Sequence, residues 1–348
     1  MIDTHAFNEL DHLASNLPQT INGYTFEKLI GKGGFSRVFL VSFPKYKIKF
    51  CAKVMPKSLM TDNQNDIDYL LNLEHPNIIR IYDQFIIGAM SYCIIEYCPG
   101  GNLHDVITDG KLKGKDKLLF FMQQILLGLE FCHENHVAHR DIKPANILID
   151  RYGRPKLIDF GISVNIEPGE LLRDFSGSRP YCPPEVILAQ PYDPYKADIW
   201  SLGVTFYIMV VGQLPWPKEP EKVMNTAIEQ AQYTIPRNVP PAIAKMISSM
   251  LQVDPEDRPT VKAILSNGLF PEKAILPSLS HKVFRDATSV SLQTKTARML
   301  VDQPKRLNNS NFFIIQATGN RNCISTFRSV AAITPTMTSM DMFQCEVS

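Results

Sequence analysis

The sequence predicts an α+β fold with two lobes: a small lobe made of a five-stranded antiparallel sheet and one main helix, and a large, mainly α-helical lobe. Residues 24–97 contain short segments rich in β-branched and aromatic residues, whereas residues 98–270 contain long apolar patterns of helical period. The turn sequence CPGGN separates the two parts. A strand-rich part followed by a helix-rich part favours two lobes with a cleft between them.

The small lobe is predicted from segments in which apolar and polar residues partly alternate. One helix is expected at residues 65–73, where NDIDYLLNL places apolar residues on one face and the HPN that follows ends the helix before the proline. The five expected strands are TFEKLIGK (25–32), FSRVFLVSF (35–43), IKFCAKVM (48–55), NIIRIYDQF (77–85) and SYCIIEY (91–97).

The large lobe is predicted from a series of apolar helical stretches. The most apolar of them, residues 197–212, is too short to cross a bilayer and carries Asp198 near its start, so we interpret it as a buried core helix. The other expected helices cover residues 118–135, 223–232, 242–251 and 260–267.

The composition of the chain excludes several classes of function. The 36 Lys and Arg residues balance 35 Asp and Glu, so no overall field favours nucleic acid or an anionic membrane. The seven cysteines are scattered without zinc-binding spacing, which indicates reduced thiols in a cytoplasmic or nuclear protein. The N-terminus lacks a signal-peptide pattern, and no apolar run is long enough to span a bilayer.

Three parts are expected along the chain. Residues 1–23 form an N-terminal extension, residues 24–270 form the two-lobed domain, and residues 271–348 form a tail rich in Ser, Thr, Asn and Gln. The tail has only short apolar stretches, which leaves its order open, and it contains no basic amphipathic helix of the kind that calmodulin binds.

A glycine-rich turn lies between the first two expected strands. In GKGGFSRV, Gly31 and Gly33 lack side chains, so backbone N–H groups there could approach phosphate oxygens. The pattern alone is weak, because such hairpins are often structural and Ser36 stands where the third glycine of GxGxxG would be. On the next strand Lys53 follows Ala52 in an apolar context, which suits a phosphate-binding lysine, although an exposed strand lysine is the alternative.

The segment HRDIKPANIL at residues 139–148 is the most specific signal in the chain. Asp141 is suited to accept the proton of a substrate hydroxyl, Lys143 to meet a transferring phosphoryl group, and Asn146 to hold a magnesium ion. DFG follows at residues 159–161, and its Asp159 supplies a second metal ligand. These oxygen ligands suit Mg²⁺ and do not suit zinc.

In this order, the motifs of residues 24–270 resemble the catalytic domain of the eukaryotic protein kinase superfamily. Lys143 within HRDIKPAN resembles the serine/threonine branch. EYCPGGNLHD, taken with the apolar segment 197–216, resembles the calcium/calmodulin-dependent and AMP-activated kinase group. The resemblance implies ATP and Mg²⁺ as cofactors and protein substrates that bear Ser or Thr. It implies the catalytic residues Asp141, Lys143 and Lys53 and the metal ligands Asn146 and Asp159.

The resemblance also assigns a nucleotide site. Ile95 takes the gatekeeper position, Glu96 and Cys98 lie at the hinge that receives adenine, and Val38, Ala52 and Leu148 would sandwich the ring. The full set of implied nucleotide-binding residues is Ile30, Gly31, Lys32, Gly33, Gly34, Phe35, Ser36, Val38, Ala52, Lys53, Asp66, Ile95, Glu96, Cys98, Asn146, Leu148 and Asp159.

Two structural anchors follow from the same resemblance. In GSRPYCPPE, Ser178 takes the position of the substrate-loop threonine, and Glu185 is expected to pair with Arg258. Asp198 is expected to be buried and to anchor the backbone of the HRD loop.

The chain departs from the family pattern on the helix of the small lobe. The glutamate that usually pairs with the phosphate-binding lysine is replaced by Asp66, which is one methylene shorter. The pair with Lys53 would then be long or water-bridged, with Asp68 as the fallback partner, and small misplacements at such a site reduce the rate by about a hundredfold.

A second departure concerns activation. Asp174 stands where related kinases carry a phosphorylatable threonine, so its carboxylate could pair with Arg140 without an upstream kinase. The alternative is a solvated loop carboxylate, and Ser163 and Ser176 are further candidate phosphorylation sites.

A third departure concerns the substrate. Asn102, Ala145 and Ile208 occupy positions where arginine-directed relatives carry acids, which predicts no strong preference for upstream arginine.

Two other function classes remain open. A pseudokinase would keep the fold as a nucleotide-binding scaffold, a reading that Asp66 and Ser36 favour, but it has no need for Lys53, Asp141 and Asp159 together. A small-molecule phosphotransferase is disfavoured by GSRPYCPPE and DIWSLG, and a P-loop NTPase is excluded because GxxxxGK[ST] is absent. We expect a monomer that binds neither nucleic acid nor membrane, with an unknown regulatory partner.

Overall fold

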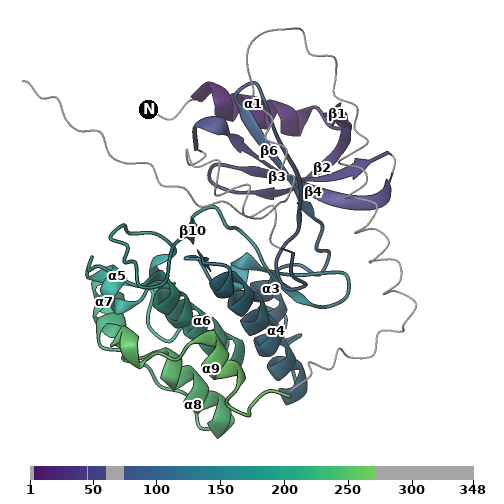
Figure 1. Ribbon diagram of the computed structural model, residues 1–348. Coiled ribbons are helices and arrows are strands. Elements are labelled where there is room, and N and C mark those ends of the chain that lie inside the picture. Colours follow the sequence, from purple (N-terminus) through teal and green to yellow (C-terminus); the bar gives the residue numbers. More distant parts are fainter. Residues whose placement is uncertain (1–3, 45, 60–73, 272–348) are drawn as a thin grey trace, which may run out of the picture. The chain divides into compact units, whose positions relative to one another are not determined.

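A six-stranded antiparallel sheet forms the small lobe of the computed structural model, which describes residues 4–44, 46–59 and 74–271 (Figure 1). The strand order is β1-β2-β3-β4-β6-β5. Five strands are the expected ones, and the sixth, β1, is added by the N-terminal segment beside β2. The strands are β1 (Gln19–Ile21), β2 (Tyr24–Lys32), β3 (Arg37–Phe43), β4 (Tyr46–Pro56), β5 (Ile81–Ile87) and β6 (Met90–Glu96), and a 3-10 turn η1 (Lys57–Leu59) follows β4.

The two faces of this sheet have different neighbours. Because successive side chains of a strand point to opposite faces, Ala52 and Lys53 of β4 face apart. Ala52 packs with Phe39 and Ile94 in the buried core of the small lobe. Lys53 lies in one cross-strand row with Val38 and Cys93. A ligand of Lys53 would therefore bind on the face of the sheet that lies opposite the small-lobe core.

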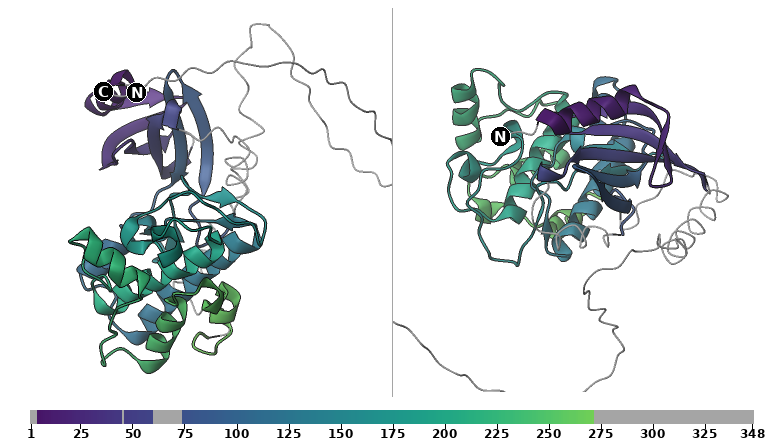
Figure 2. Two further views of the ribbon diagram at one scale, coloured as in Figure 1. Left: turned by 90° about the vertical axis from the view of Figure 1, so that its left-hand side faces the viewer. Right: turned by 90° about the horizontal axis from the view of Figure 1, so that it is seen from above.

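Helix α1 (Thr4–Ser15) covers the core face of the sheet, as the view from above shows (Figure 2). Leu10 and Leu13, one helical turn apart, are both buried in the same cluster as Phe39 and Ile94. The N-terminal extension expected from the sequence is thus folded against the small lobe in this part of the chain.

Strand β5 begins at Ile81, four residues later than the sequence predicts. Asn77 explains the difference, because its Nδ2 donates to Gln124 Oε1 at 3.1 Å and to the carbonyl of Pro155 at 2.9 Å. The backbone N–H of Leu157 in turn donates to the Asn77 carbonyl at 2.8 Å. Residues 77–79 are therefore bound to the large lobe instead of extending β5. The helix predicted at residues 65–73 lies outside the described residues.

The large lobe is organised around two long helices, α4 and α6. Helix α6 is buried along most of its length and contributes Trp200 and Phe206 to the main core, as expected for the apolar segment 197–212. Asp193 caps its start by accepting from the Tyr195 N–H, and Gly212 ends it at φ +86°. The helices are α3 (Leu103–Thr108), α4 (Lys115–Glu134), α5 (Pro184–Ile187), α6 (Pro194–Val211), α7 (Glu221–Glu229), α8 (Pro241–Met250) and α9 (Val261–Leu265).

Short strands and 3-10 turns connect these helices and carry the functional loops. Strand β7 pairs with β10, and β8 pairs with β9, both antiparallel. None of the described helices combines the length and apolarity that a membrane crossing requires. The connecting elements are β7 (Val137–Ala138), η2 (Pro144–Asn146), β8 (Ile147–Ile149), β9 (Pro155–Leu157), β10 (Val164–Asn165), η3 (Arg179–Tyr181) and η4 (Pro255–Asp257).

Arg258 and Glu185 form the buried ion pair that the sequence predicts. Two parallel hydrogen bonds of 2.7 and 2.8 Å join the guanidinium to the carboxylate, and both side chains are almost fully buried. The guanidinium also lies 5.1 Å from the centre of the Trp200 ring and donates to the carbonyls of Gln252, Lys196 and Val253. All the N–H groups of the Arg258 guanidinium thus have hydrogen-bond acceptors, which a buried charge needs.

Candidate active site

The loop of residues 139–146 is anchored from below by Asp198 of α6. The carboxylate accepts hydrogen bonds from the backbone N–H of His139 at 2.8 Å and of Arg140 at 2.7 Å, and His133 Nε2 lies 3.0 Å from it. Asp198 has no exposed surface, and Arg140 takes a left-handed φ of +68°. A non-glycine residue in that region is held there by its surroundings, which here means the Asp198 contacts. The predicted anchoring role of Asp198 is confirmed.

Asp141 is surrounded by donors that fix its carboxylate. Lys143 Nζ approaches Oδ2 at 2.6 Å, and Asn146 Nδ2 approaches the same oxygen at 2.7 Å. Ser178 donates its hydroxyl to Oδ1 at 2.9 Å and accepts from Lys143 Nζ at 2.6 Å. The four residues implied for the acceptor site are therefore brought together, and one of them already presents an aliphatic hydroxyl to Asp141.

Asp159 and Lys53 join the two lobes through an ion pair of 2.6 Å between Oδ1 and Nζ. Burial opposes ionisation of Asp159, but the adjacent Lys53 ammonium, with smaller effects of His139 and Lys143, lowers the pKa of the carboxyl from its ordinary value of 3.8. Asp159 adopts φ +66°, again a left-handed conformation imposed on a non-glycine residue. The partners expected for Lys53 on the small-lobe helix, Asp66 and Asp68, lie outside the described residues.

Phe160 and His139 connect the two loops that carry the site. Their rings lie 4.8 Å apart, and His139 Nε2 is 3.0 Å from the Ile158 carbonyl. The segment before Asp159 is therefore held against the loop that carries Asp141, which fixes the two carboxylates relative to one another.

The glycine turn at the end of β2 is closed by one backbone bond, from the Gly33 N–H to the Ser36 carbonyl at 2.9 Å. A Cβ at Gly33 would come within 2.8 Å of Ser36 Oγ, a side-chain hydroxyl that can rotate away, and its next neighbour would be the Ser36 carbonyl at 3.6 Å. Ile30 and Phe35 are 41% and 54% exposed, so the tip of the hairpin is open to a ligand. The phosphate-binding roles of Ile30, Gly31, Lys32, Gly33, Gly34, Phe35 and Ser36 stay predictions.

One assignment of the nucleotide site is wrong. Ala52 was expected to contact the adenine ring, but it is fully buried on the face of the sheet opposite Lys53. The residue on the Lys53 face is Cys51, two positions before the lysine, and it lies opposite Ile95 of β6. The period of two along β4 could have identified Cys51 from the sequence.

The gatekeeper position Ile95 and the hinge residue Glu96 are the last two residues of β6, and the hinge residue Cys98 lies just after it. Glu96 donates its N–H to the Arg80 carbonyl and pairs with the buried Lys156 at 2.9 Å, a partner that sequence reasoning missed. Cys98 is buried, and burial raises the pKa of its thiol. The Gly100 N–H donates to the Ile149 carbonyl at 3.0 Å, which places the hinge beside the strand that carries Leu148. The adenine-binding roles of Ile95, Glu96, Cys98, Val38 and Leu148 stay predictions.

The activation segment, residues 159–185, contacts the catalytic loop, residues 139–146, through Arg140. Its guanidinium forms a close ion pair with Asp174, the pairing that the sequence predicts, and also donates to the Tyr192 hydroxyl at 3.0 Å. Gly177 adopts φ +93°, and a Cβ there would lie only 2.6 Å from the Arg140 carbonyl. The segment therefore contacts the catalytic loop on both sides of Phe175, in addition to the contacts of Ser178 with Asp141 and Lys143.

The three positions relevant to upstream arginine have different surroundings. Asn102 caps α3 by accepting from the Asp105 N–H at 2.9 Å, and Ile208 is buried in the main core. Ala145 is exposed beside Asn146. The described residues thus supply no carboxylate at any of the three positions.

Asn146 and Asp159 keep the oxygen ligands that magnesium would need. Asn146 uses Nδ2 for Asp141, which leaves its Oδ1 as a ligand oxygen, and Lys53 occupies only one oxygen of Asp159. Within the described residues nothing donates to the other Asp159 oxygen, so a carboxylate and an amide oxygen remain for a hard cation.

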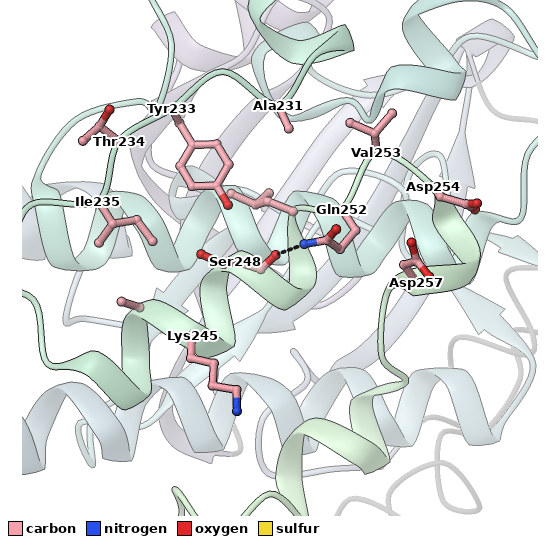
Figure 3. Close-up of a pocket in the computed structure, with 12 residues that line it drawn as sticks. Ala231, Tyr233, Thr234, Ile235, Lys245, Ser248, Gln252, Val253, Asp254 and Asp257 are labelled. Atoms are coloured by element: carbon pink, nitrogen blue, oxygen red, sulfur yellow. Dashed lines mark hydrogen bonds between the residues drawn. The ribbon is translucent and has the colours of Figure 1, made fainter.

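A separate surface pocket of about 880 Å³ lies in the large lobe, between residues 231–235 and α8 (Figure 3). Its polar groups serve the local backbone: Gln252 donates to the Ser248 carbonyl, and Asp254 caps η4. None of the implied catalytic or nucleotide-binding residues lines it, and we assign it no function.

Comparison with known proteins places this geometry in context. The family model described as "Protein kinase domain" matches residues 24–270. Among curated proteins, "Maternal embryonic leucine zipper kinase" of Xenopus tropicalis is 36% identical over 70% of this chain and 38% of its own length. "Sperm motility kinase 2B" of Mus musculus is 31% identical over 72% and 53%, and "SNF1-like protein kinase ssp2" of Schizosaccharomyces pombe is 33% identical over 70% and 43%. The chain thus spans about half or less of the length of these relatives.

Proposed function

Because the chain belongs to the protein kinase domain family, we propose that it is an active serine/threonine kinase that transfers the γ-phosphoryl group of Mg-ATP to hydroxyls of protein substrates. The family match and relatives such as the SNF1-like kinase agree with the predicted bilobal fold and with the resemblance to the AMP-activated kinase group. The proposal concerns what this particular chain does.

The observation that carries the proposal is the hydrogen bond that the Ser178 hydroxyl donates to the Asp141 carboxylate. An aliphatic alcohol donates to Asp141 Oδ1 at 2.9 Å while Lys143 Nζ stands 2.6 Å from both the alcohol and the carboxylate. A substrate serine or threonine has the same chemistry and would take a place beside the same oxygen. A positioned acceptor and a cation next to it are what phosphoryl transfer requires.

In the proposed reaction the chain's residues mainly position and neutralise. Asp141 orients the attacking hydroxyl and receives its proton, while Lys143 and Lys53 offset the charge of the transferring phosphoryl group. Asn146 and Asp159 would hold Mg²⁺, which supplies charge neutralisation at the phosphate oxygens. Bound nucleotide would replace part of the Lys53–Asp159 contact, because both groups face the same region.

We further propose that activity does not require phosphorylation of the activation segment. The Arg140–Asp174 pair supports this, since a fixed carboxylate already occupies the guanidinium that a phosphate would bind. Arg140 is almost buried, with 7% of its side chain exposed, so its charge needs a partner. The carboxylate supplies about one charge where a phosphate would supply nearly two.

Substrate choice should not depend on arginine upstream of the acceptor. None of Asn102, Ala145 and Ile208 itself carries a carboxylate to read such a residue, and the burial of Ile208 removes that position from any peptide surface. Dominant selection for arginine three residues before the acceptor, in a peptide library, would contradict this part of the proposal.

The second candidate function is a pseudokinase that binds nucleotide as a scaffold. The replacement of the third glycine by Ser36 and of the usual glutamate by Asp66 favours it. The donor cluster on Asp141 argues against it, because a scaffold needs no orientated base beside Lys143.

The test is transfer of label from radioactive Mg-ATP to a generic protein substrate, followed by phosphoamino acid analysis. The proposal predicts label on serine and threonine and its loss in Asp141→Asn. Nucleotide binding without any transfer would favour the pseudokinase.

The remaining expectations are also proposals. We propose a monomer in the cytoplasm or nucleus that acts on proteins and binds neither nucleic acid nor membrane. The near-zero net charge and the free thiols of Cys51, Cys93, Cys98, Cys132 and Cys182 support this environment.

A further inference from the structure

Arg37, the first residue of β3, links helix α1 to the glycine turn. Its guanidinium donates to Asp11 Oδ1 through Nη2 at 2.8 Å and through Nε at 3.2 Å. Through Nη1 it donates to the carbonyl oxygens of Gly33 and Ser36, each at 3.2 Å. One side chain therefore joins α1 to both ends of the turn that would cradle the phosphates.

The link acts from the face of the sheet opposite the nucleotide. Arg37 shares its face of β3 with Phe39 and Val41, which pack in the core beneath α1. Val38 lies on the Lys53 face. Asp11 therefore acts on the turn only through Arg37, as part of a positioning device.

The helix is a firm support for this link. Leu10 and Leu13 flank Asp11 and are 0% and 6% exposed in the small-lobe core. The Arg37 side chain is 12% exposed, whereas Asp11 is 61% exposed. The helix is thus held by the buried side chains of Leu10 and Leu13, and its Asp11 carboxylate, which holds Arg37, is exposed and can be substituted without disturbing the core.

A backbone hydrogen bond restrains the turn together with Arg37. The backbone bond from Gly33 to Ser36 closes it, and the Ser36 carbonyl that accepts this bond is the same oxygen that accepts from Arg37. Ordering a mobile glycine turn opposes binding, so a restraint that orders it beforehand improves affinity.

We propose that α1 positions the glycine turn for Mg-ATP through Asp11 and Arg37, so that the segment preceding the kinase domain tunes affinity for ATP. The helix lies outside residues 24–270, so this device is separate from the family match. The effect on ATP rests on the proposed function, whereas the restraint on the turn does not.

The test compares Asp11→Asn with Glu27→Gln in the full chain. Glu27 of β2 forms a surface ion pair with Lys49 on the same sheet, so the control removes a similar pair that does not touch the turn. We expect Asp11→Asn to raise the KM for ATP about two- to fivefold, as befits an exposed pair, with kcat and Tm nearly unchanged. Hydrogen exchange of the amides of residues 33–37 should become faster in this variant alone.

Several results would overturn the proposal. Exchange rates or a KM for ATP equal to those of Glu27→Gln would do so. Additive effects of Asp11→Asn and Arg37→Gln in the double variant would also do so, because residues that act through one another are non-additive. If the wild-type protein transferred no phosphate, the proposed function would fail, but the exchange comparison would still decide whether α1 restrains the turn.

Discussion

The catalytic loop and the activation segment meet at Asp141, but they are held in different ways. The loop rests on Asp198, which is completely buried and accepts two backbone hydrogen bonds. The middle of the segment is exposed, with Leu171 at 58% and Phe175 at 50%, and it reaches the loop through the Arg140–Asp174 pair. The position of Asp141 is therefore set by the buried core through Asp198, whereas access to Asp141 depends on the surface contact between Arg140 and Asp174.

This difference separates stability from activity. Changes at the buried end of the segment, where Glu185 meets Arg258, should reduce the stability of the large lobe. Changes in the exposed middle should alter phosphoryl transfer while leaving the free energy of unfolding almost unchanged. The following predictions test that separation, from the largest effect to the smallest.

Glu185→Gln should have the largest effect, on stability. The substitution leaves the Arg258 guanidinium buried without its countercharge, and breaking such a pair lowers the free energy of unfolding by about 3–5 kcal/mol. Denaturant unfolding measures it. The control is Glu221→Gln, which removes an exposed pair with Arg179 and should change stability by less than about 1 kcal/mol. Equal effects of the two substitutions would contradict the comparison.

Gly177→Ala should reduce kcat/KM about a hundredfold, and it should lower the free energy of unfolding by less than Glu185→Gln does. The new Cβ would lie 2.6 Å from the Arg140 carbonyl, so the segment must move away from the catalytic loop and take Ser178 with it. The control is Gly169→Ala, because Gly169 has the same left-handed φ, +92°, but no atom within 4 Å of its Cβ position. Similar losses in both variants would show that backbone strain, not the close approach, is responsible.

Lys53→Met should change the pH dependence of Mg-nucleotide binding. In the wild-type protein the charge of Lys53 is the main effect that lowers the pKa of Asp159 against burial. The Asp159 carboxylate therefore stays ionised at pH values below the ordinary pKa of an aspartate. Without Lys53, only the smaller effects of His139 and Lys143 oppose burial, so that pKa should rise. Calorimetry between about pH 5 and 8 should show binding of Mg-ADP weakening at a higher pH in the variant than in the wild type. The variant Lys53→Arg keeps the charge and should retain the wild-type profile.

Asp174→Asn should reduce the rate of the unphosphorylated enzyme only a few-fold. Asp174 is 56% exposed, although Arg140 is almost buried, so we expect the lost interaction to correspond to about 1 kcal/mol, and Tyr192 still accepts from Arg140. Initial rates at saturating ATP measure it, with the exposed Glu170→Gln in the same segment as control. An unchanged rate would show that Asp174 is a solvated carboxylate without a role in docking.

The sequence predicted best what depends on local pattern. The strands of the small lobe and the helices of the large lobe were predicted because the period of their apolar residues specifies them, whereas the Arg258–Glu185 pair was expected from the family resemblance. Ala52 was misassigned because a motif read without strand alternation does not say which face a residue takes. The Lys156–Glu96 pair and the Asp11–Arg37 link were missed because they join segments that are distant in sequence.

Helix α1 was missed for a different reason. Its apolar positions Leu10 and Leu13 repeat over a single turn, which is too short a pattern to distinguish an amphipathic helix from an unstructured extension. The sheet face that it covers supplies the missing information, and only the fold contains it.

The most direct test is the initial rate of phosphoryl transfer by protein made in bacteria, treated with phosphatase and shown by mass spectrometry to carry no phosphate. The account predicts steady labelling of serine and threonine from Mg-ATP, abolished by Asp141→Asn and increased little by an added upstream kinase. A protein that is inert until another kinase phosphorylates its activation segment would contradict the account.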